Sequence, residues 1–166
     1  MRVLGIDCGS EFTGYGIVER RPDDSLQAIS YGAIKLKTRD ALPWRLLQVW
    51  DELRGQIEAH APQMVAVEGV FFAHNVKSAL KLGQVRGVAL LVAASCGLEV
   101  AEYAPLAIKS AVVGYGQAEK AQVQQMVTRL LRLPEIPQPP DAADALAIAI
   151  CHLNTSSTLA RQTATI

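Results

Sequence analysis

The sequence predicts an α/β fold in which a five-stranded mixed sheet is flanked by helices. The first 37 or so residues have the pattern of strands joined by tight turns, which indicates an antiparallel meander. Farther along, apolar runs alternate with stretches of helical periodicity, and such crossovers place helices on the faces of a sheet. Hydrophobic residues make up 50% of the 166 residues, enough for one domain to bury a substantial core.

The predicted meander has three strands. Residues 2–7 form an apolar run that a carboxylate closes, after which Gly9 and Ser10 turn the chain. Residues 15–19 form the second strand. A turn rich in Pro, Asp and Ser then leads to residues 26–37, which alternate loosely between apolar and polar side chains.

A helix and a buried strand follow the meander. Apolar side chains recur every three or four residues over 42–57, and Pro43 falls in the first turn, where proline is tolerated. Residues 64–68 form a continuous apolar run that ends in a carboxylate. Such a run is typical of a strand that is buried on both faces.

The remaining elements continue this alternation. We expect a long helix, a fifth strand, two shorter helices and a last helix at residues 75–96, 98–103, 105–113, 119–131 and 141–153. From Asn154 onward the chain is small and polar. We therefore expect one domain over residues 1–153 and a flexible C-terminal tail over residues 154–166.

Composition narrows the class of protein. No apolar run approaches the roughly 20 residues that span a bilayer, and the first residues lack the apolar segment of a signal peptide. We therefore expect a cytoplasmic protein with no membrane partner. Its three cysteines are widely spaced and should be free thiols. Sixteen basic residues balance sixteen acidic ones, so any nucleic-acid contact must rest on local charge.

Four carboxylates suggest the chemistry. Asp7 and Glu68 end two predicted strands, and Asp141 and Asp144 share one face of the last helix at a spacing of i, i+3. That helix is apolar nearly all round and is therefore buried, where an unpaired carboxylate is costly. A divalent cation would remove this cost, and Mg²⁺ prefers oxygen ligands. Two such ions can stabilise both the attacking and the leaving oxygen in phosphodiester cleavage.

Each carboxylate also has a purely structural interpretation. Asp7 could open the turn that follows it, and Glu68 could pair with Arg86 or a lysine. Asp141 would make a good N-cap, and Asp144 would then lie in the first turn, where the helix dipole favours negative charge. Taken together, the four favour a metal-dependent reaction.

Five stretches, in order from about residue 2 to 152, carry a family resemblance. They are Gly5-Ile6-Asp7-Cys8-Gly9-Ser10 with Thr13-Gly14-Tyr15-Gly16, Val67-Glu68-Gly69-Val70-Phe71, residues 78–88, Val112-Val113-Gly114-Tyr115-Gly116 with Ala118-Glu119-Lys120, and residues 141–147. This ordered set resembles the RuvC family of bacterial Holliday junction resolvases, the crossover junction endodeoxyribonucleases.

The resemblance implies an RNase H-like fold and a homodimer. It implies Asp7, Glu68, Asp141 and Asp144 as catalytic metal ligands, with two Mg²⁺ ions for each subunit and Mn²⁺ able to replace them. It also implies the reaction, which is paired symmetric nicking of a four-way DNA junction in homologous recombination and DNA repair. The usual partner of the family is a branch-migration motor complex.

Two residues depart from the family's pattern. Cys8 stands where proline is common, and Gly69 stands where Gln or Glu is common. Neither change removes a ligand. Cys8 could make the site sensitive to oxidation or to soft metals, and Gly69 could loosen the backbone beside Glu68.

Several residues are candidates for DNA contacts. Phe71 matches the family's junction-contacting aromatic and could stack on bases, although core packing is the ordinary alternative. The candidates for phosphate contacts are Lys77, Lys81, Arg86, Lys109 and Lys120. For these the alternative is a solvated helix face. Lys109 and Lys120 rank first because they match basic positions near the family's active site.

The long helix carries small residues at a spacing that favours close approach. Ala79, Gly83 and Gly87 lie at i, i+4 and i+8 and share one face, which could pack on the sheet or on a second subunit. We favour the dimer because the resemblance implies it and because two-fold oligomers are the commonest kind.

Three other functions fit part of the pattern. An ATP-binding protein of the actin and sugar-kinase type also places Asp-x-Gly in an opening hairpin, but it needs a second domain and a second glycine-rich motif. A nuclease of the same fold that acts on RNA–DNA hybrids or structured RNA would use the same carboxylates. A non-catalytic junction-binding module would be expected to lack at least one of them, and all four are present.

Overall fold

The computed structural model describes residues 1–37, 39–69 and 76–163, with the side chains of the last helix described up to Ser156. Within these ranges the chain forms five strands and five helices. In chain order they are β1 (Arg2–Asp7), β2 (Phe12–Arg20), β3 (Leu26–Lys35), α1 (Leu42–His60), β4 (Met64–Glu68), α2 (Val76–Ser95), β5 (Glu99–Tyr103), α3 (Pro105–Val113), α4 (Lys120–Leu130) and α5 (Pro140–Thr163).

The strands form one mixed sheet in the order β3-β2-β1-β4-β5. β1, β2 and β3 make the antiparallel meander that the turns predicted, whereas β4 and β5 run parallel to β1. The five-stranded mixed sheet is therefore confirmed. The second strand is longer than predicted, since β2 begins at Phe12 and its pairing with β3 extends to Arg20.

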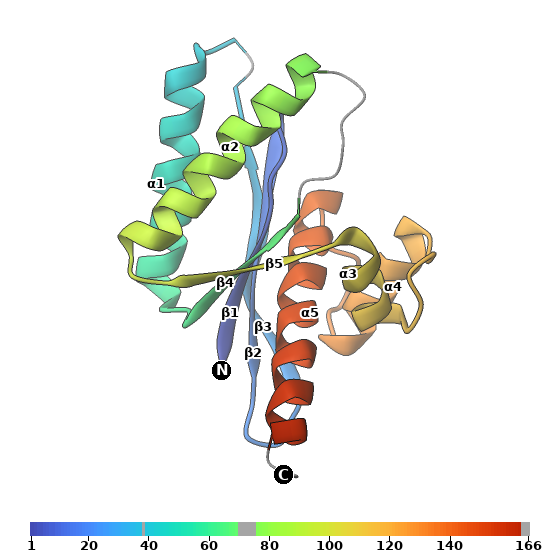
Figure 1. Ribbon diagram of the computed structural model, residues 1–166. Helices are drawn as coiled ribbons and strands as arrows, with labels where there is room; N and C mark the ends of the chain where they lie inside the picture. Colours follow the sequence, from blue (N-terminus) through green and yellow to red (C-terminus); the bar gives the residue numbers. More distant parts are fainter. Residues whose placement is uncertain (38, 70–75, 164–166) are drawn as a thin grey trace.

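Helices cover both faces of the sheet (Figure 1). α1 and α2 lie on one face, and α5 crosses the other with α3 and α4 packed outside it. Each face has its own apolar core, because successive side chains of a strand point to opposite sides. Along β1, Leu4 and Ile6 belong to the core under α1 and α2, and Val3 belongs to the core under α5.

Glycine allows α5 to lie directly on the sheet. A Cβ atom at Gly5 of β1 would overlap the backbone carbonyl of Ala145, and one at Gly14 of β2 would overlap the carbonyl of Asp141. The helix backbone thus occupies the space that side chains would fill at these two positions. As a result the first turns of α5 lie beside the end of β1, where Gly14 is the cross-strand partner of Asp7.

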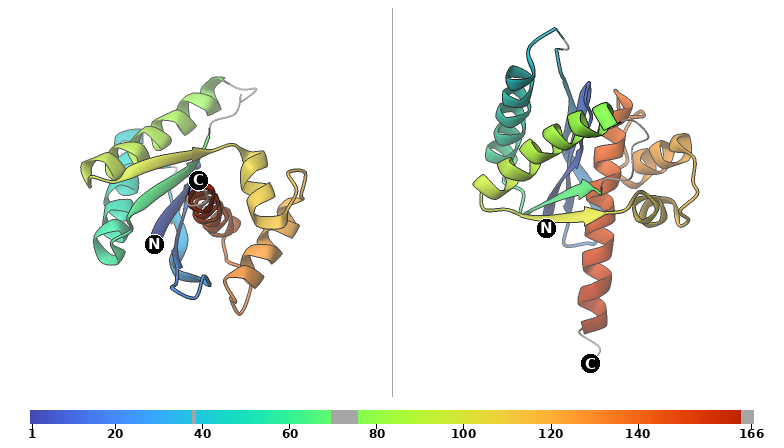
Figure 2. Two further views of the ribbon diagram at one scale, coloured as in Figure 1. Left: turned by 60° about the horizontal axis from the view of Figure 1, so that its bottom comes forward. Right: turned by 45° about the horizontal axis from the view of Figure 1, so that its top comes forward.

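The last helix is longer than the sequence predicts. The pattern places its end near residue 153, whereas the helix continues to Thr163, past the end of the sheet (Figure 2). The side chain of Asn154 accepts a hydrogen bond from Arg20 at 2.8 Å and donates one to the carbonyl of Ala111 at 3.1 Å. These partners come from distant parts of the chain, so the polar composition alone predicted the wrong end. The division into a domain and a flexible tail remains a prediction.

The length and hydropathy of the helices bear on membrane association. Within the described ranges, no helix combines the length and the apolar character needed to cross a bilayer.

Candidate active site

Two of the predicted carboxylates lie at the same end of neighbouring strands. β1 and β4 are parallel, and Ile6 is paired with Val67. The next residue of each strand, Asp7 in β1 and Glu68 in β4, therefore lies at the carboxyl end of its strand beside the other. Ile6 and Val67 both point toward the core under α1 and α2. Because side chains alternate along a strand, Asp7 and Glu68 point to the other face, toward α5.

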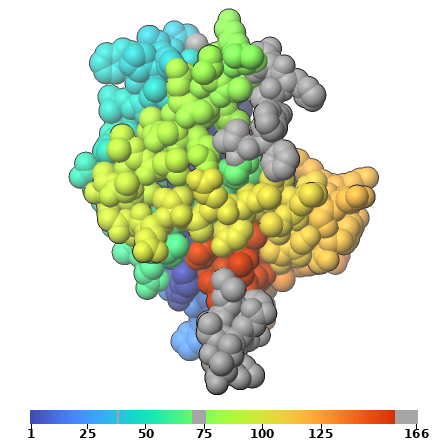
Figure 3. All heavy atoms as spheres, in the orientation of Figure 1, coloured from blue at the N-terminus to red at the C-terminus, as the bar shows by residue number. Residues whose placement is uncertain are grey.

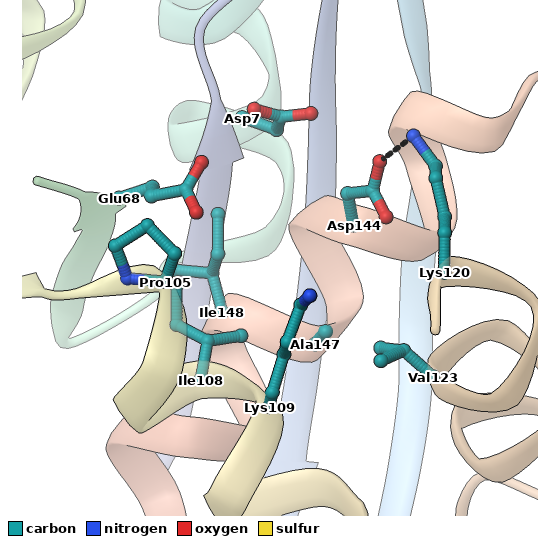
Figure 4. Close-up of a pocket in the computed structure, with 10 residues that line it drawn as sticks. All are labelled: Asp7, Glu68, Pro105, Ile108, Lys109, Lys120, Val123, Asp144, Ala147 and Ile148. Carbon is teal, nitrogen blue, oxygen red and sulfur yellow. Dashed lines mark ion pairs between the residues drawn. The ribbon is translucent and has the colours of Figure 1, made fainter. Parts of the chain in front are cut away.

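The third carboxylate comes from α5. Asp7, Glu68 and Asp144 line one pocket of about 220 Å³ and face it from three different elements (Figure 4). Asp141 lies one helical turn before Asp144 and does not line this pocket, although its charge acts on Asp7. The structure thus brings three of the four predicted ligands together, with the fourth close enough to interact electrostatically.

Two lysines share the pocket with the carboxylates. Lys109 comes from α3, which Pro105 opens directly after β5, and its ammonium group points toward the carboxylates (Figure 4). Lys120 is the first residue of α4. The first turn of this helix is held by a hydrogen bond in which the backbone N–H of Glu119, its N-cap, donates to the Gln122 side chain at 2.8 Å. Both lysines thus lie beside the predicted ligands, and their contact with DNA stays a prediction.

Burial and neighbouring negative charges raise the pKa of two of the carboxylates, Asp7 and Glu68. Burial raises the pKa of Asp7 to about 7, helped by the negative charges of Asp144, Glu68 and Asp141, while Lys120 opposes the shift. Burial and Asp144 also raise the pKa of Glu68, while Lys109 and Lys120 lower it. The pocket therefore holds more negative charge than its own lysines neutralise, which is the condition that a bound cation would relieve.

Lys120 forms an ion pair with one of the predicted ligands. Its Nζ atom lies 2.6 Å from Oδ2 of Asp144. The hydrogen bond to Asp144 raises the pKa of Lys120, so the lysine stays protonated. One carboxylate of the cluster is therefore already engaged by a protein cation.

The donor set fits a hard divalent cation in its chemistry. All four candidate ligands are carboxylates, the oxygen donors that Mg²⁺ prefers. Across the described residues, no three His, Cys, Asp or Glu side chains already converge as a metal site. Binding would therefore require side-chain rearrangement, and Asp144 in particular is turned toward Lys120.

An adjoining hollow contains the residues that depart from the family's pattern. Asp7, Cys8, Glu68, Gly69 and Arg86 line it. Burial, reinforced by the charge of Asp7, raises the pKa of the Cys8 thiol to about 12. The thiol therefore stays protonated at neutral pH and is a poor nucleophile and metal ligand, which argues against the oxidation sensitivity that the sequence suggested. The backbone N–H of Gly69 donates to the carbonyl of Tyr103 at 2.8 Å, so this backbone is held in place.

Arg86 has a structural partner that the sequence did not reveal. Its side chain is only 14% exposed, and its Nη2 lies 2.6 Å from Oε2 of Glu102 on β5. The guanidinium thus links α2 to the sheet edge beside Glu68. This position leaves Arg86 less accessible to a phosphate than Lys77, Lys81 and Lys120, which are exposed.

The other predicted DNA contacts lie in different places. Lys77 and Lys81 are exposed on the first turns of α2, and Lys81 lines a hollow next to Arg45. Phe71 lies outside the described residues. Sequence reasoning missed the apolar wall of the active-site pocket, to which Pro105 and Ile108 contribute. Their spacing of i, i+3 beside Lys109 on a predicted helix was the signal that could have indicated it.

Comparisons with known proteins agree on one family. The sequence model of the family described as crossover junction endodeoxyribonuclease RuvC matches residues 3–152. A protein with that name from Koribacter versatilis is 63% identical over 161 residues, which cover 97% of each chain. The protein with that name from Acidobacterium capsulatum is 58% identical and covers 98% of each chain.

Solved structures agree with the sequence comparisons. RuvC of T. thermophilus in complex with a Holliday junction substrate has a TM-score of 0.87 at 29% identity, covering 95% of this chain and 96% of that one. The yeast mitochondrial Holliday junction resolvase Ydc2, at 15% identity and a TM-score of 0.68, shares the fold. The fold is RNase H-like, as the resemblance implied. The chain belongs to the RuvC family of crossover junction endodeoxyribonucleases.

Proposed function

We propose that this protein is a Mg²⁺-dependent endonuclease that resolves four-way DNA junctions by paired symmetric nicks, in homologous recombination and DNA repair. The observation that carries the proposal is the pocket in which Asp7, Glu68 and Asp144 face one another from β1, β4 and α5. The similar T. thermophilus protein has been solved with a Holliday junction, which supports this substrate.

Asp7, Glu68, Asp141 and Asp144 would hold the metal. We infer two Mg²⁺ ions for each subunit, with Mn²⁺ able to replace them. When bound, the metal supplies Lewis-acid stabilisation of the attacking and leaving oxygens of the scissile phosphate. The raised pKa values of Asp7 and Glu68 support this role, since they arise from burial and from neighbouring carboxylate charge, and a cation would offset the cost of both.

The remaining pocket residues act on the phosphate and on water. The ammonium groups of Lys109 and Lys120 lie beside the carboxylates and can neutralise the non-bridging oxygens of the scissile phosphate. Pro105 and Ile108 form an apolar wall, which lowers the local dielectric constant and strengthens these charge interactions. Lys120 would exchange Asp144 for the phosphate when a metal takes that carboxylate.

We further propose that the protein acts as a homodimer joined along α2. The small-residue face of this helix points away from the sheet: Gly83 and Gly87 are exposed, and a Cβ on either would meet no described atom within 4 Å. Leu80 and Leu91 are 64% and 58% exposed, and α2 crosses the visible face of the molecule uncovered (Figure 3). The helix packs on the core through another side, which includes Val85.

A two-fold dimer matches the near two-fold symmetry of a four-way junction. Each subunit can then present one pocket to one of two related strands, which accounts for paired nicks. We also propose that a branch-migration motor complex holds the same junction, as the family resemblance implies.

Cleavage of a synthetic four-way DNA junction in Mg²⁺ tests the proposal. Linear duplex and an RNA–DNA hybrid serve as comparison substrates, and Asp7→Asn serves as the inactive variant. Paired symmetric nicks on the junction alone, absent in the variant, would support the proposal. Cutting of the hybrid instead would show that the same site acts on RNA–DNA hybrids. Binding of the junction without cutting, under several divalent metals, would contradict the proposal that the protein is an active nuclease.

A further inference from the structure

A group of cations lies beyond the active-site pocket, at the end of the sheet where β1 ends. The hollow beside Asp7 is the first of three at this end of the sheet. Ser10, Arg45 and Lys81 line the second hollow. Lys35, Lys37 and Arg39 line the third, which has a volume of about 340 Å³. The second and third hollows share Leu36 as a lining residue. We call Lys35, Lys37, Arg39, Arg45 and Lys81 the basic track.

The hollows are neighbours at this end of the sheet. Leu82 and Arg86 of α2 line the hollow at Asp7, and their chain neighbours Lys81 and Val85 line the second hollow. The hollows therefore follow one another from the carboxylates, under the start of α2, to the edge strand β3.

The outer part of the track has a fixed backbone. Phe12 pairs with Lys35 at the ends of β2 and β3, and the N–H of Leu36 donates to the carbonyl of Glu11 at 2.8 Å. The Gln48 side chain of α1 donates to the carbonyl of Lys35 at 3.2 Å. The ammonium group of Lys35 lies 5.9 Å from the centre of the Phe12 ring, so the aromatic face is already covered by a cation.

Positive charge exceeds negative charge along the outer part. In the part of the chain that the structure describes, neither Lys35 nor Lys37 forms an ion pair. Arg39 approaches Asp40 only at 3.9 Å, with its side chain 84% exposed. The only acidic residue among those lining this hollow in the described structure is Glu11. This excess occurs on a protein whose formal net charge is zero.

In the described structure, Arg45 has a buried donor without an acceptor, as Arg2, Arg20 and Arg86 do. Its Nε atom is buried and has no hydrogen-bond partner among the described residues. A buried donor without an acceptor is costly, and an anionic oxygen is the acceptor that a guanidinium binds best. Arg45 and Lys81 both line the middle hollow.

We propose that the basic track binds the phosphate backbone of one arm of the DNA substrate and guides it away from the active-site pocket. This inference rests on the proposed function and extends it to Lys35, Lys37, Arg39 and Arg45. Backbone contacts of this kind position a duplex and carry no base readout, in keeping with an aromatic ring that is covered by Lys35. The track is therefore expected to bind a DNA arm without regard to its base sequence.

The test is the salt dependence of junction binding, measured without divalent metal. Lys35→Gln combined with Lys37→Gln removes two track charges. Arg21→Gln combined with Arg54→Gln is the matched control, since it removes two charges from other parts of the surface. The slope of log Kd against log salt should become shallower by about 0.9 for each phosphate that the track variant no longer neutralises. It should stay unchanged in the control.

Two further measurements separate the outcomes. The single-turnover rate at saturating enzyme should be the same in wild type and track variant, because neither lysine lies in the pocket. Shortening one arm stepwise should bring the wild-type affinity down to that of the track variant. Equal slopes in wild type and track variant, or an equal change of slope in the control, would overturn the proposal that the track binds DNA. The proposed nuclease function would not be affected by that result. A wild-type protein that neither binds nor cuts junctions would instead overturn the proposed function and the track with it.

Discussion

The Nζ atom of Lys120 lies 2.6 Å from the carboxylate of Asp144, so a protein cation engages a residue that we propose as a metal ligand. A metal ion and this ammonium group therefore compete for the same oxygen. The pair is partly exposed, at 61% and 25% for the two side chains, which limits its strength to about 1 kcal/mol or less.

Lys120→Gln should therefore strengthen metal binding in the absence of DNA, by up to about fivefold given that limit. The same variant should cut junctions more slowly, since it lacks a charge that neutralises the phosphate. Calorimetric titration with Mn²⁺ checks the first effect and single-turnover cleavage the second. Arg21→Gln is the control for overall charge, and weaker metal binding in Lys120→Gln would contradict the competition.

Asp7→Asn should abolish cleavage and preserve junction binding. Loss of a ligand removes several kcal/mol of transition-state stabilisation, so the rate should fall by roughly three orders of magnitude or more. Single-turnover cleavage and a gel-shift assay without metal measure the two properties. Asp51→Asn, on the exposed side of α1, is the matched control and should cut normally. Full activity in Asp7→Asn would remove Asp7 from the ligand set.

The raised pKa of Asp7 predicts a pH dependence of stability. Its pKa is about 7 in the folded protein against an ordinary value of 3.8, so the folded state holds this proton more tightly than the unfolded state does. Ionising Asp7 therefore costs stability progressively as the pH rises from about 4 to about 7, and the full cost is present above that range. Without metal, Asp7→Asn should be more stable than wild type at pH 8 by about 1–3 kcal/mol.

Urea denaturation of wild type and Asp7→Asn at pH 4 and pH 8, in a chelator, measures this difference. The stability difference should be much smaller at pH 4, where Asp7 is protonated in the folded state and still roughly 40% protonated in the unfolded state. Saturating Mg²⁺ at pH 8 should raise the stability of wild type more than that of the variant, because the ion relieves the same repulsion. A stability difference that is identical at both pH values would show that charge is not its cause.

Leu80→Glu should convert the proposed dimer into a monomer. The change places a charge in the exposed apolar face of α2, where a second copy would have to bury it. Leu47→Glu is the matched control, since Leu47 is also an exposed leucine on a helix but lies on α1. Sedimentation velocity gives the oligomeric state, and a nicked-junction assay shows whether paired cutting is lost with it. If the Leu80→Glu variant is still a dimer, the interface does not lie on this face of α2.

The placement of Asp7 and Glu68 was predictable because it depends on local pattern. Each ends an apolar run, and parallel pairing of the two runs brings their carboxyl ends together. The pairing of Arg86 with Glu102 was not predictable in this way, since the two residues come from different elements. The length of α5 was missed for the same reason: the contacts of Asn154 with Arg20 and Ala111 are tertiary.

The direct contact of the α5 backbone with Gly5 and Gly14 has a consequence for how mutations act on this enzyme. Ordinary core substitutions change side chains, and such changes can be absorbed by repacking. Here the spacing between sheet and helix is set by backbone atoms, and any larger residue at Gly5 must displace the helix that carries Asp144. Loss-of-function variants should therefore occur at these two glycines as readily as at the carboxylates themselves, although neither glycine has a functional group.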